Sequence, residues 1–144
     1  MTLLERVRGM IRGEVAPAPV AGLVGFRILE VEPGRAAFEM ETGPQHANPM
    51  GTLHGGILCD LADAAMGIAY ASTLGEGETF TTLELKINFF KPVWNARLRA
   101  DARIVKRGKT VGMTECDVVD EKGSLVARAS STCMTLAGEM AKGR

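Results

Sequence analysis

Residues 57–72 read ILCDLADAAMGIAYAS, and the expected architecture is built around this stretch. It is rich in Ala, Leu, Ile and Met, so apolar residues occupy nearly every face of the helix that it would form. A helix that is apolar all round is buried inside a protein. Gly75 and Gly77 follow, and glycine favours the end of a helix. The sequence therefore predicts one long buried helix near the middle of the chain.

On both sides of this helix, apolar and polar residues alternate, which predicts β-strands. The run TTLELKINFF begins at Thr81 and places Leu83, Leu85, Ile87 and Phe89 on one face. The expected strands are 26–31, 36–41, a strand that starts at 80 and ends before 92, and then 97–106, 111–120 and 125–136. One buried helix with five or six mostly antiparallel strands gives an α+β domain whose sheet wraps around the helix.

The N-terminal residues predict a short amphipathic helix, because apolar residues recur at helical spacing between Leu3 and Ile11. Pro17 and Pro19 would interrupt it. A chain of 144 residues suits one domain. We therefore expect a single domain over residues 1–144, with an N-terminal helix and linker at 1–18 and a C-terminal tail at 137–144.

The chain carries 17 basic and 17 acidic side chains, so its formal net charge is zero. Proteins that bind nucleic acid usually have a basic excess, and we expect no nucleic-acid partner. The charges are unevenly distributed: residues 1–90 carry 6 basic and 11 acidic side chains, whereas residues 91–144 carry 11 and 6. The basic excess gathers around Lys106, Arg107 and Lys109, at an expected turn between two strands.

The cysteines and the ends of the chain predict a cellular compartment. Cys59, Cys116 and Cys133 have no CxxC spacing, which favours free thiols in a reducing environment. The N-terminal residues put charges through their apolar stretch and lack the core of a signal peptide. The longest mainly apolar run, 57–71, contains two aspartates and is too short to span a membrane. We expect a cytoplasmic protein without a membrane partner.

Two glycines open the expected buried helix, and they point to chemistry. Gly55 and Gly56 allow either a tight backbone approach or the approach of a ligand. The free N–H groups of the first helical turn would hold an anion or a polarised carbonyl oxygen. Asp63 lies two turns further on, among apolar residues where a carboxylate is costly unless it is paired or used. Asp60 is closer to the helix start and can reach solvent, so Asp63 is either a functional or a satisfied structural carboxylate.

Six residues between positions 48 and 63 form a motif: Asn48, Gly51, His54, Gly55, Gly56 and Asp63. The motif resembles the signature of the PaaI-type acyl-CoA thioesterases, which belong to the hotdog-fold superfamily. The similarity extends from about residue 19 to residue 136 and includes the segments GFRILEVEPGRA, TLELKINFFKPV and RGKTV. It implies a hotdog fold, an antiparallel sheet wrapped around one long helix, assembled into dimers and often tetramers.

The resemblance also implies a reaction and a role for each motif residue. The substrate would be an acyl-CoA, hydrolysed to the free acid and CoA without a further cofactor. Asp63 would be the general base or nucleophile, and the Gly55 N–H would form the oxyanion contact. Asn48 would position the attacking water or the thioester. His54 would support the Gly55 loop and hydrogen-bond the thioester oxygen, and Gly56 would line the approach of the substrate.

Residues outside the motif receive roles as well. A hydroxyl group on the next strand would assist Asp63; Thr82 matches best, and a slip of one residue would put Thr81 in its place. The residues assigned to the phosphates of CoA are Lys106, Arg107 and Lys109, with a solvated hairpin tip as the alternative. The aromatic residues Phe89, Phe90 and Trp94 are expected in the core or a subunit interface rather than in an acyl pocket.

The spacing of Gly55 and Asp63 adds an independent argument. They are eight residues apart, which is about 12 Å along a helix axis. An oxyanion donor and a base must each lie about 3 Å from the reacting atoms. Two such groups of one chain cannot serve one thioester, so catalysis requires a homodimer with two composite sites. The resemblance extends this expectation to a homotetramer.

Several alternatives remain open from the sequence. Asp63 either activates a water molecule or attacks the thioester to give a mixed anhydride, and the acyl group is either a small aryl group or a short or medium chain. No GxSxG elbow is present, and His46 and His54 lack further ligands, so no metal site is expected. The competing functions are a non-catalytic acyl-CoA-binding protein and a hotdog dehydratase or hydratase.

Overall fold

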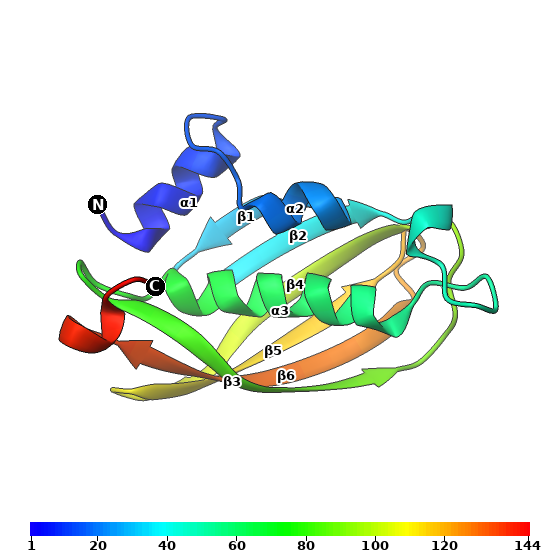
Figure 1. Ribbon diagram of the computed structural model, residues 1–144. Helices are drawn as coiled ribbons and strands as arrows, with labels where there is room; N and C mark the ends of the chain where they lie inside the picture. The colour runs from blue at the N-terminus through cyan, green and yellow to red at the C-terminus, as the bar shows by residue number, and fades with distance from the viewer.

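The computed structural model describes residues 1–144 as one twisted antiparallel sheet wrapped around a central helix (Figure 1). The central helix is α3 (Gly55–Ala71). The strands are β1 (Phe26–Glu32), β2 (Arg35–Glu41), β3 (Thr79–Phe89), β4 (Arg97–Arg107), β5 (Val111–Val119) and β6 (Leu125–Leu136). This is the hotdog arrangement, which confirms the fold predicted from the sequence.

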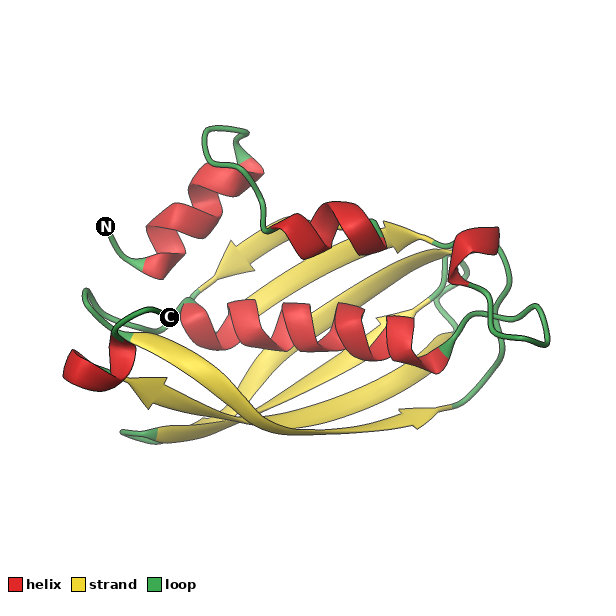
Figure 2. Ribbon diagram, viewed as in Figure 1, coloured by secondary structure: helices red, strands yellow, loops and turns green.

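The sheet is six-stranded with the order β1-β2-β4-β5-β6-β3, and all neighbouring strands are antiparallel. Figure 2 shows α3 lying along the hollow face of this sheet, with the two edge strands on either side of it. The edge strand β3 pairs with β6 alone, so its other edge is free of backbone partners within the chain.

The core lies between α3 and the inner face of the sheet. Leu61, Ala62, Ala65, Met66 and Ala69 of α3 have no exposed surface. They pack against the inward side chains of the central strands, which are Leu98 and Ala100 of β4, Cys116 and Val118 of β5, and Val126 and Ala127 of β6. This packing confirms that residues 57–72 form a buried helix.

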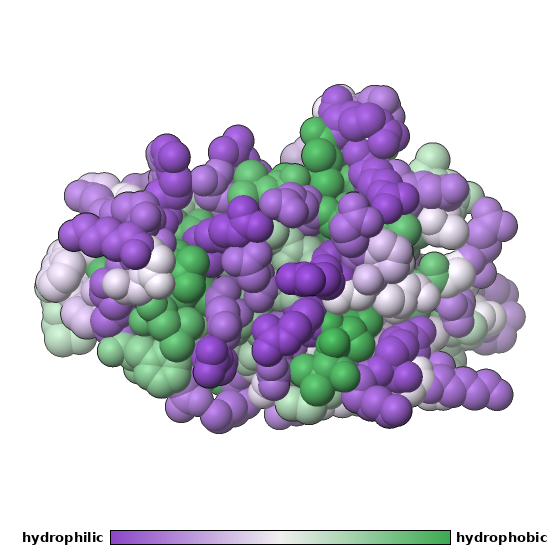
Figure 3. All heavy atoms as spheres, turned by 180° about the vertical axis from the view of Figure 1, so that it is seen from behind, coloured by the Kyte–Doolittle hydropathy of each residue, from purple (hydrophilic) through white to green (hydrophobic).

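The outer face of the sheet differs sharply from the core. Seen from behind, the molecule is largely hydrophilic, with small apolar patches (Figure 3). Cross-strand ion pairs cover this face, including Arg103 with Glu115 and Arg128 with Asp117, each at 2.6 Å. The alternation of the strands therefore separates one apolar face from one charged face.

A bulge in β3 changes the predicted faces of that strand. Its pairing with β6 shifts by one residue between Thr82 and Glu84, which leaves Leu83 as the extra residue. Leu83 is 53% exposed, so the prediction that it shares the inner face with Leu85 and Ile87 was wrong. A bulge interrupts strict alternation, because two residues of one strand then oppose a single residue of the other.

The same bulge selects the threonine that faces α3. Thr82 pairs with Cys133 of β6, whose side chain is fully buried. Uninterrupted alternation from Phe89 would instead have turned Thr81 inward. The extra residue therefore exchanges the two threonines.

Two short helices precede the sheet. The helix α1 (Leu3–Ile11) was expected; its N-cap Thr2 accepts a hydrogen bond from the Glu5 N–H, and the Glu5 carboxylate accepts one from the Thr2 N–H. The helix α2 (Pro19–Val24) was not expected, because Pro19 was interpreted as a breaker alone. Proline is also favoured in the first turn of a helix, where its missing N–H costs nothing.

Two further short segments are 3₁₀ turns, η1 (Pro44–His46) and η2 (Gly138–Ala141). No helix of the structure combines the length and the apolar character needed to cross a membrane.

Candidate active site

The first turn of α3 carries an unpaired backbone donor. The N-cap residue His54 accepts a hydrogen bond at Nδ1 from the Gly56 N–H, at 2.8 Å. The backbone N–H of His54 donates to the carbonyl oxygen of His46, at 2.9 Å. The Gly55 N–H lies between these two bonds and meets no acceptor in the chain. An N–H at this position is favourably placed for a carbonyl oxygen that develops negative charge.

The glycine at position 55 is required by a close neighbour. A Cβ atom there would lie 2.9 Å from Cζ of Phe89, at the end of β3. At Gly56 a Cβ atom would lie 2.8 Å from Nδ1 of His54 and would disturb the cap. Both glycines therefore avoid a clash with a neighbouring side chain, which is the close approach expected from the sequence. At Gly55 the missing Cβ atom also leaves the N–H donor unblocked, which is the other interpretation.

Asn48 shapes the loop that leads into α3. Its Oδ1 accepts hydrogen bonds from the N–H groups of Met50 at 2.9 Å and Thr52 at 3.1 Å, and its Nδ2 donates to Oγ1 of Thr52 at 2.7 Å. Gly51 completes the turn with a φ of 88°, a value that favours glycine. The Asn48 side chain is therefore bound to its own loop, and it lines neither the cavity at Asp63 nor the recess at Gly55.

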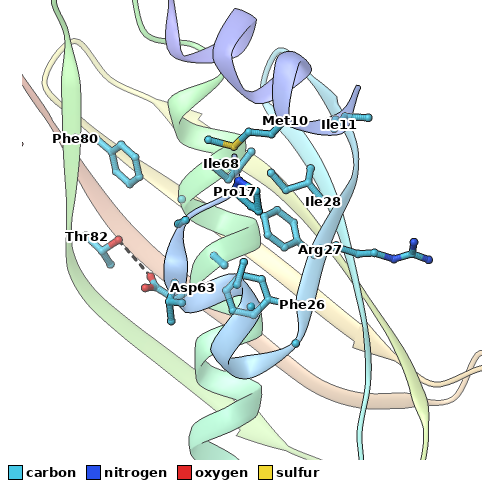
Figure 4. Close-up of a pocket in the computed structure, with 18 residues that line it drawn as sticks. Met10, Ile11, Pro17, Phe26, Arg27, Ile28, Asp63, Ile68, Phe80 and Thr82 are labelled. Carbon is cyan, nitrogen blue, oxygen red and sulfur yellow. Dashed lines mark hydrogen bonds between the residues drawn. The ribbon is translucent and has the colours of Figure 1, made fainter. Parts of the chain in front are cut away.

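Asp63 lies in the middle of α3 and faces β3. The hydroxyl of Thr82 donates to Oδ1 of Asp63 at 3.3 Å, and the two side chains point toward one another in Figure 4. Burial raises the pKa of Asp63 above its ordinary value; the Thr82 hydrogen bond lowers it, and the charge of nearby Asp60 raises it further. A carboxylate with a raised pKa at a cavity is a candidate general base.

Asp63 and Thr82 stand at the polar end of a cavity of about 690 Å³. Its other walls are mostly apolar, and they include Met10, Ile11, Phe26, Ile28, Ile68 and Phe80. Arg27 also borders the cavity, but its guanidinium points outward in Figure 4 and binds Glu39 of β2 at 3.1 Å. Cavities of this size and polarity are typical of small-molecule sites.

Gly55 borders a different recess, of about 430 Å³, together with Leu53, Phe89 and Pro92. The large cavity contains Asp63 and Thr82, and neither residue lines the recess at Gly55. One chain therefore holds the two polar groups in separate hollows along α3. This arrangement agrees with the spacing of about 12 Å that helical geometry gives.

The basic turn between β4 and β5 lies beside the C-terminal end of α3, away from both hollows. The guanidinium of Arg107 lies 4.7 Å above the ring of Tyr70 and donates to Oγ1 of Thr73 at 3.0 Å. Lys106 and Lys109 are exposed. The structure therefore separates the three predicted residues: Arg107 binds the chain itself, whereas the two lysines reach into solvent.

The histidines occupy different surroundings. His46 is buried, and its Nε2 donates to the carbonyl oxygen of Val24 at 2.6 Å while its Nδ1 accepts from the Gly43 N–H at 3.0 Å. His54 is exposed and caps α3. Both ring nitrogens of His46 are thus engaged within the chain.

Sequence reasoning missed the N-terminal wall of the large cavity. Met10, Ile11 and Pro17 line it together with residues of α2 and β1. The apolar spacing of α1 indicated a buried face but not what that face covers. Residue patterns along one segment carry no information about which distant segments enclose a cavity.

The hotdog fold and a polar pair at an apolar cavity define a class, and comparison with known proteins identifies it. Residues 50–127 match the sequence model of the thioesterase superfamily, so the chain belongs to that superfamily and is a thioester hydrolase. The human protein acyl-coenzyme A thioesterase 13 is 30% identical over 110 residues, which cover 73% of this chain and 76% of the relative.

Two further comparisons narrow the class. The 1,4-dihydroxy-2-naphthoyl-CoA hydrolase of Listeria monocytogenes is 28% identical over 109 residues, 76% of this chain and 89% of the relative. A mutant of the phenylacetic acid degradation protein PaaI from Thermus thermophilus has a solved structure with 30% sequence identity and a TM-score of 0.76. It covers 81% of this chain and 98% of that one. These likenesses confirm the PaaI-type resemblance.

Proposed function

We propose that this protein is an acyl-CoA thioesterase that hydrolyses aryl or short- to medium-chain acyl-CoA to the free acid and CoA. The observation that carries the proposal is the Asp63–Thr82 pair at the polar end of an apolar cavity, with the free Gly55 N–H on the same helix. Relatives named as acyl-CoA and aryl-CoA hydrolases support this substrate class. Coenzyme A enters as part of the substrate, and the reaction needs no other cofactor.

The site is completed by a second copy of the chain. The edge strand β3 touches both polar groups: Thr82 binds Asp63, and Phe89 packs on Gly55. If β3 pairs with β3 of a second copy, a two-fold axis near the middle of the strand brings Gly55 of one copy toward the partner's Asp63. A free strand edge favours such pairing, and a two-fold axis gives two equivalent sites.

The exposed aromatic residues support the same assembly. Phe89 is the last residue of β3, Phe90 and Trp94 lie in the connection that follows it, and all three are more than half exposed in the single chain. Exposed aromatic side chains are typical of a protein interface. We place these residues in the dimer contact. Catalysis requires only this dimer, whether or not two dimers assemble into a tetramer.

In the mechanism that follows, the thioester carbonyl oxygen accepts a hydrogen bond from the Gly55 N–H. The partner's Asp63 then either takes a proton from a water molecule that attacks the carbonyl carbon, or attacks that carbon itself. In the first route the new C–O bond to water replaces the C–S bond, and the thiolate of CoA takes up the proton that Asp63 received. In the second route the carboxylate of Asp63 displaces the thiolate, which takes a proton from solvent, and a water molecule then hydrolyses the mixed anhydride to the free acid and regenerates Asp63. The helix start stabilises the charge on the carbonyl oxygen.

Secondary contacts and the compartment complete the proposal. Lys106 and Lys109 are assigned to the phosphates of CoA, because phosphates bind cationic side chains that reach into solvent. Arg107 holds the turn in place through Tyr70 and Thr73. All three cysteines are free, which fits a reducing compartment such as the cytoplasm.

The decisive test is Asp63→Asn, which removes the base or nucleophile and keeps the shape of the side chain. We expect the rate of thiol release from a panel of acyl-CoAs to fall by about 10²- to 10⁴-fold, with the dimer intact by sedimentation. Asp60→Asn on the same helix is the matched control and should retain activity within a few-fold. Full activity in Asp63→Asn would exclude this assignment, and binding of acyl-CoA without thiol release by the wild type would favour a binding protein.

A further inference from the structure

Different segments of the chain supply the polar and the apolar walls of the cavity beside Asp63. The α3 and β3 walls carry the polar pair, Asp63 and Thr82, at one end. The N-terminal segment, residues 3–18, covers the cavity with apolar side chains that include Met10 and Ile11. Residues 50–127, which match the superfamily, do not include this segment. We refer to residues 3–18 as the roof.

The roof is fixed at one end and overhangs the cavity at the other. Leu3, in the first turn of α1, packs against the buried cluster of Tyr70, Ala71 and Leu74 at the end of α3. Val7 in the next turn is 3% exposed. The last turn carries Met10 and Ile11, which border the cavity. The anchored first turn therefore determines where the last turn stands.

A second contact holds the far side of the roof. Gly9 is buried against Val15, and a Cβ atom on Gly9 would lie 2.9 Å from Cγ2 of Val15. The chain therefore folds back directly behind α1 before it reaches Pro17, another residue of the cavity wall. The guanidinium of Arg8 adds an ion pair to Glu32 of β1 at 3.5 Å. These contacts make the roof a defined wall of the cavity.

We infer that the cavity holds the acyl group of the substrate and that the roof, chiefly Met10, sets the longest acyl chain that fits. This inference rests on the proposed thioesterase function. Away from the polar end the cavity wall is mostly apolar, and an acyl group that extends from a thioester carbon next to Asp63 would lie against it. An acetyl group reaches only the polar end of a cavity of about 690 Å³, whereas a longer chain or an aryl group contacts more of its apolar wall.

We expect kcat/KM to rise with the length of the acyl chain until the chain reaches the roof. Burial of one methylene group contributes enough hydrophobic free energy to raise kcat/KM by about fourfold when the cavity covers it. Each added pair of carbons should therefore improve the substrate until the chain meets Met10. Longer chains gain nothing further, because additional methylene groups collide with the roof or remain in water.

The test compares kcat/KM for saturated acyl-CoAs from acetyl to palmitoyl in the wild type, Met10→Trp and Met10→Ala. Met10→Trp fills the end of the cavity, so the preferred chain should shorten, with at least a tenfold loss for the longest good substrate and little change for acetyl-CoA. Met10→Ala should lengthen the preferred chain. Met140→Trp and Met140→Ala are the matched controls, because Met140 is 59% exposed in the C-terminal tail and lies outside the cavity.

The outcomes separate the two proposals. A wild type that releases thiol from no acyl-CoA contradicts the proposed function itself. A wild type that hydrolyses acyl-CoAs, with the same chain-length profile in both Met10 variants and both Met140 variants, overturns the role of the roof alone. Thermal unfolding of each variant identifies any that fail to fold; the smaller Met10→Ala change then carries the test by itself.

Discussion

The start of α3 and its middle hold their polar groups by different physical means. At the start, the Gly55 N–H is a backbone donor whose position depends on the His54 cap and on the absence of a side chain beside Phe89. In the middle, Asp63 is a side chain whose charge depends on burial and on the hydroxyl of Thr82. Changes at the first place act through geometry, and changes at the second act through charge.

The largest losses should come from a change at either place alone, and placing the two changes on different subunits tests whether the site is shared. Gly55→Val drives a side chain into Phe89 and blocks the donor, and loss of an oxyanion contact costs about 10²- to 10³-fold in rate. Dimers formed from co-expressed Gly55→Val and Asp63→Asn chains should recover about a quarter of wild-type activity, since half of the dimers are mixed and each holds one intact site. Two differently tagged copies of each chain allow the mixed dimer to be purified and its thiol release measured.

The control is the same purification with Asp63→Asn in both tagged chains, which should stay inactive. Mixed dimers that form in full yield and yet remain inactive would contradict a site shared between subunits.

The bulge makes a second, smaller prediction about the middle of α3. Thr82→Val removes the hydrogen bond to Asp63, so we expect a loss of about three- to tenfold in kcat/KM, the usual effect of one hydrogen bond. The neighbouring change Thr81→Val removes no contact to Asp63 and should cost less. Steady-state kinetics on one preferred acyl-CoA measures both; a larger loss in Thr81→Val would place the wrong threonine at the site.

The basic turn at the end of α3 should affect binding rather than chemistry. Lys106→Ala with Lys109→Ala is expected to raise KM for acyl-CoA by about threefold and to weaken its dependence on salt, with kcat unchanged. Arg107→Ala should instead lower the melting temperature, because it loses the Tyr70 and Thr73 contacts. Kinetics at low and high salt together with thermal unfolding separate these effects. An unchanged KM in the variant that lacks both lysines would show that they are ordinary surface charges and do not bind CoA.

The smallest effect concerns stability and pH. The pKa of Asp63 is raised in the folded state, so between its unfolded and folded pKa values the folded protein binds more protons, and the free energy of unfolding falls as the pH rises. Asp63→Asn removes this penalty. We expect its melting temperature to exceed that of the wild type by a few degrees at neutral pH, with the difference shrinking in acid. A difference that grows in acid would contradict the direction of the pKa change.

Much of this architecture could be predicted from the sequence, because periodicity reports how a segment is buried. The apolar residues 57–72 predicted α3, and alternation predicted all six strands. The spacing of Gly55 and Asp63 also predicted that one chain places them apart, since helical geometry fixes that distance.

The features that the sequence did not predict depend on contacts between distant segments. The bulge at Leu83 arises from pairing with β6 and cannot be derived from β3 alone. Arg107 looks like any basic residue of a turn until the structure places it over Tyr70. The wall that Met10 and Ile11 add to the cavity likewise depends on how α1 folds back over β1 and α3.

The extra residue in β3 has a consequence for how this strand can vary during evolution. Many side chains are acceptable at Leu83, because it is exposed and serves as a spacer. Deletion of Leu83 would remove the bulge and leave Thr82 opposite Cys133 and Glu84 opposite Thr132, so the hydroxyl would still face α3. Position 83 therefore tolerates both substitution and deletion, whereas regular pairing that kept every residue would turn Thr81 inward and take the Thr82 hydroxyl away from Asp63.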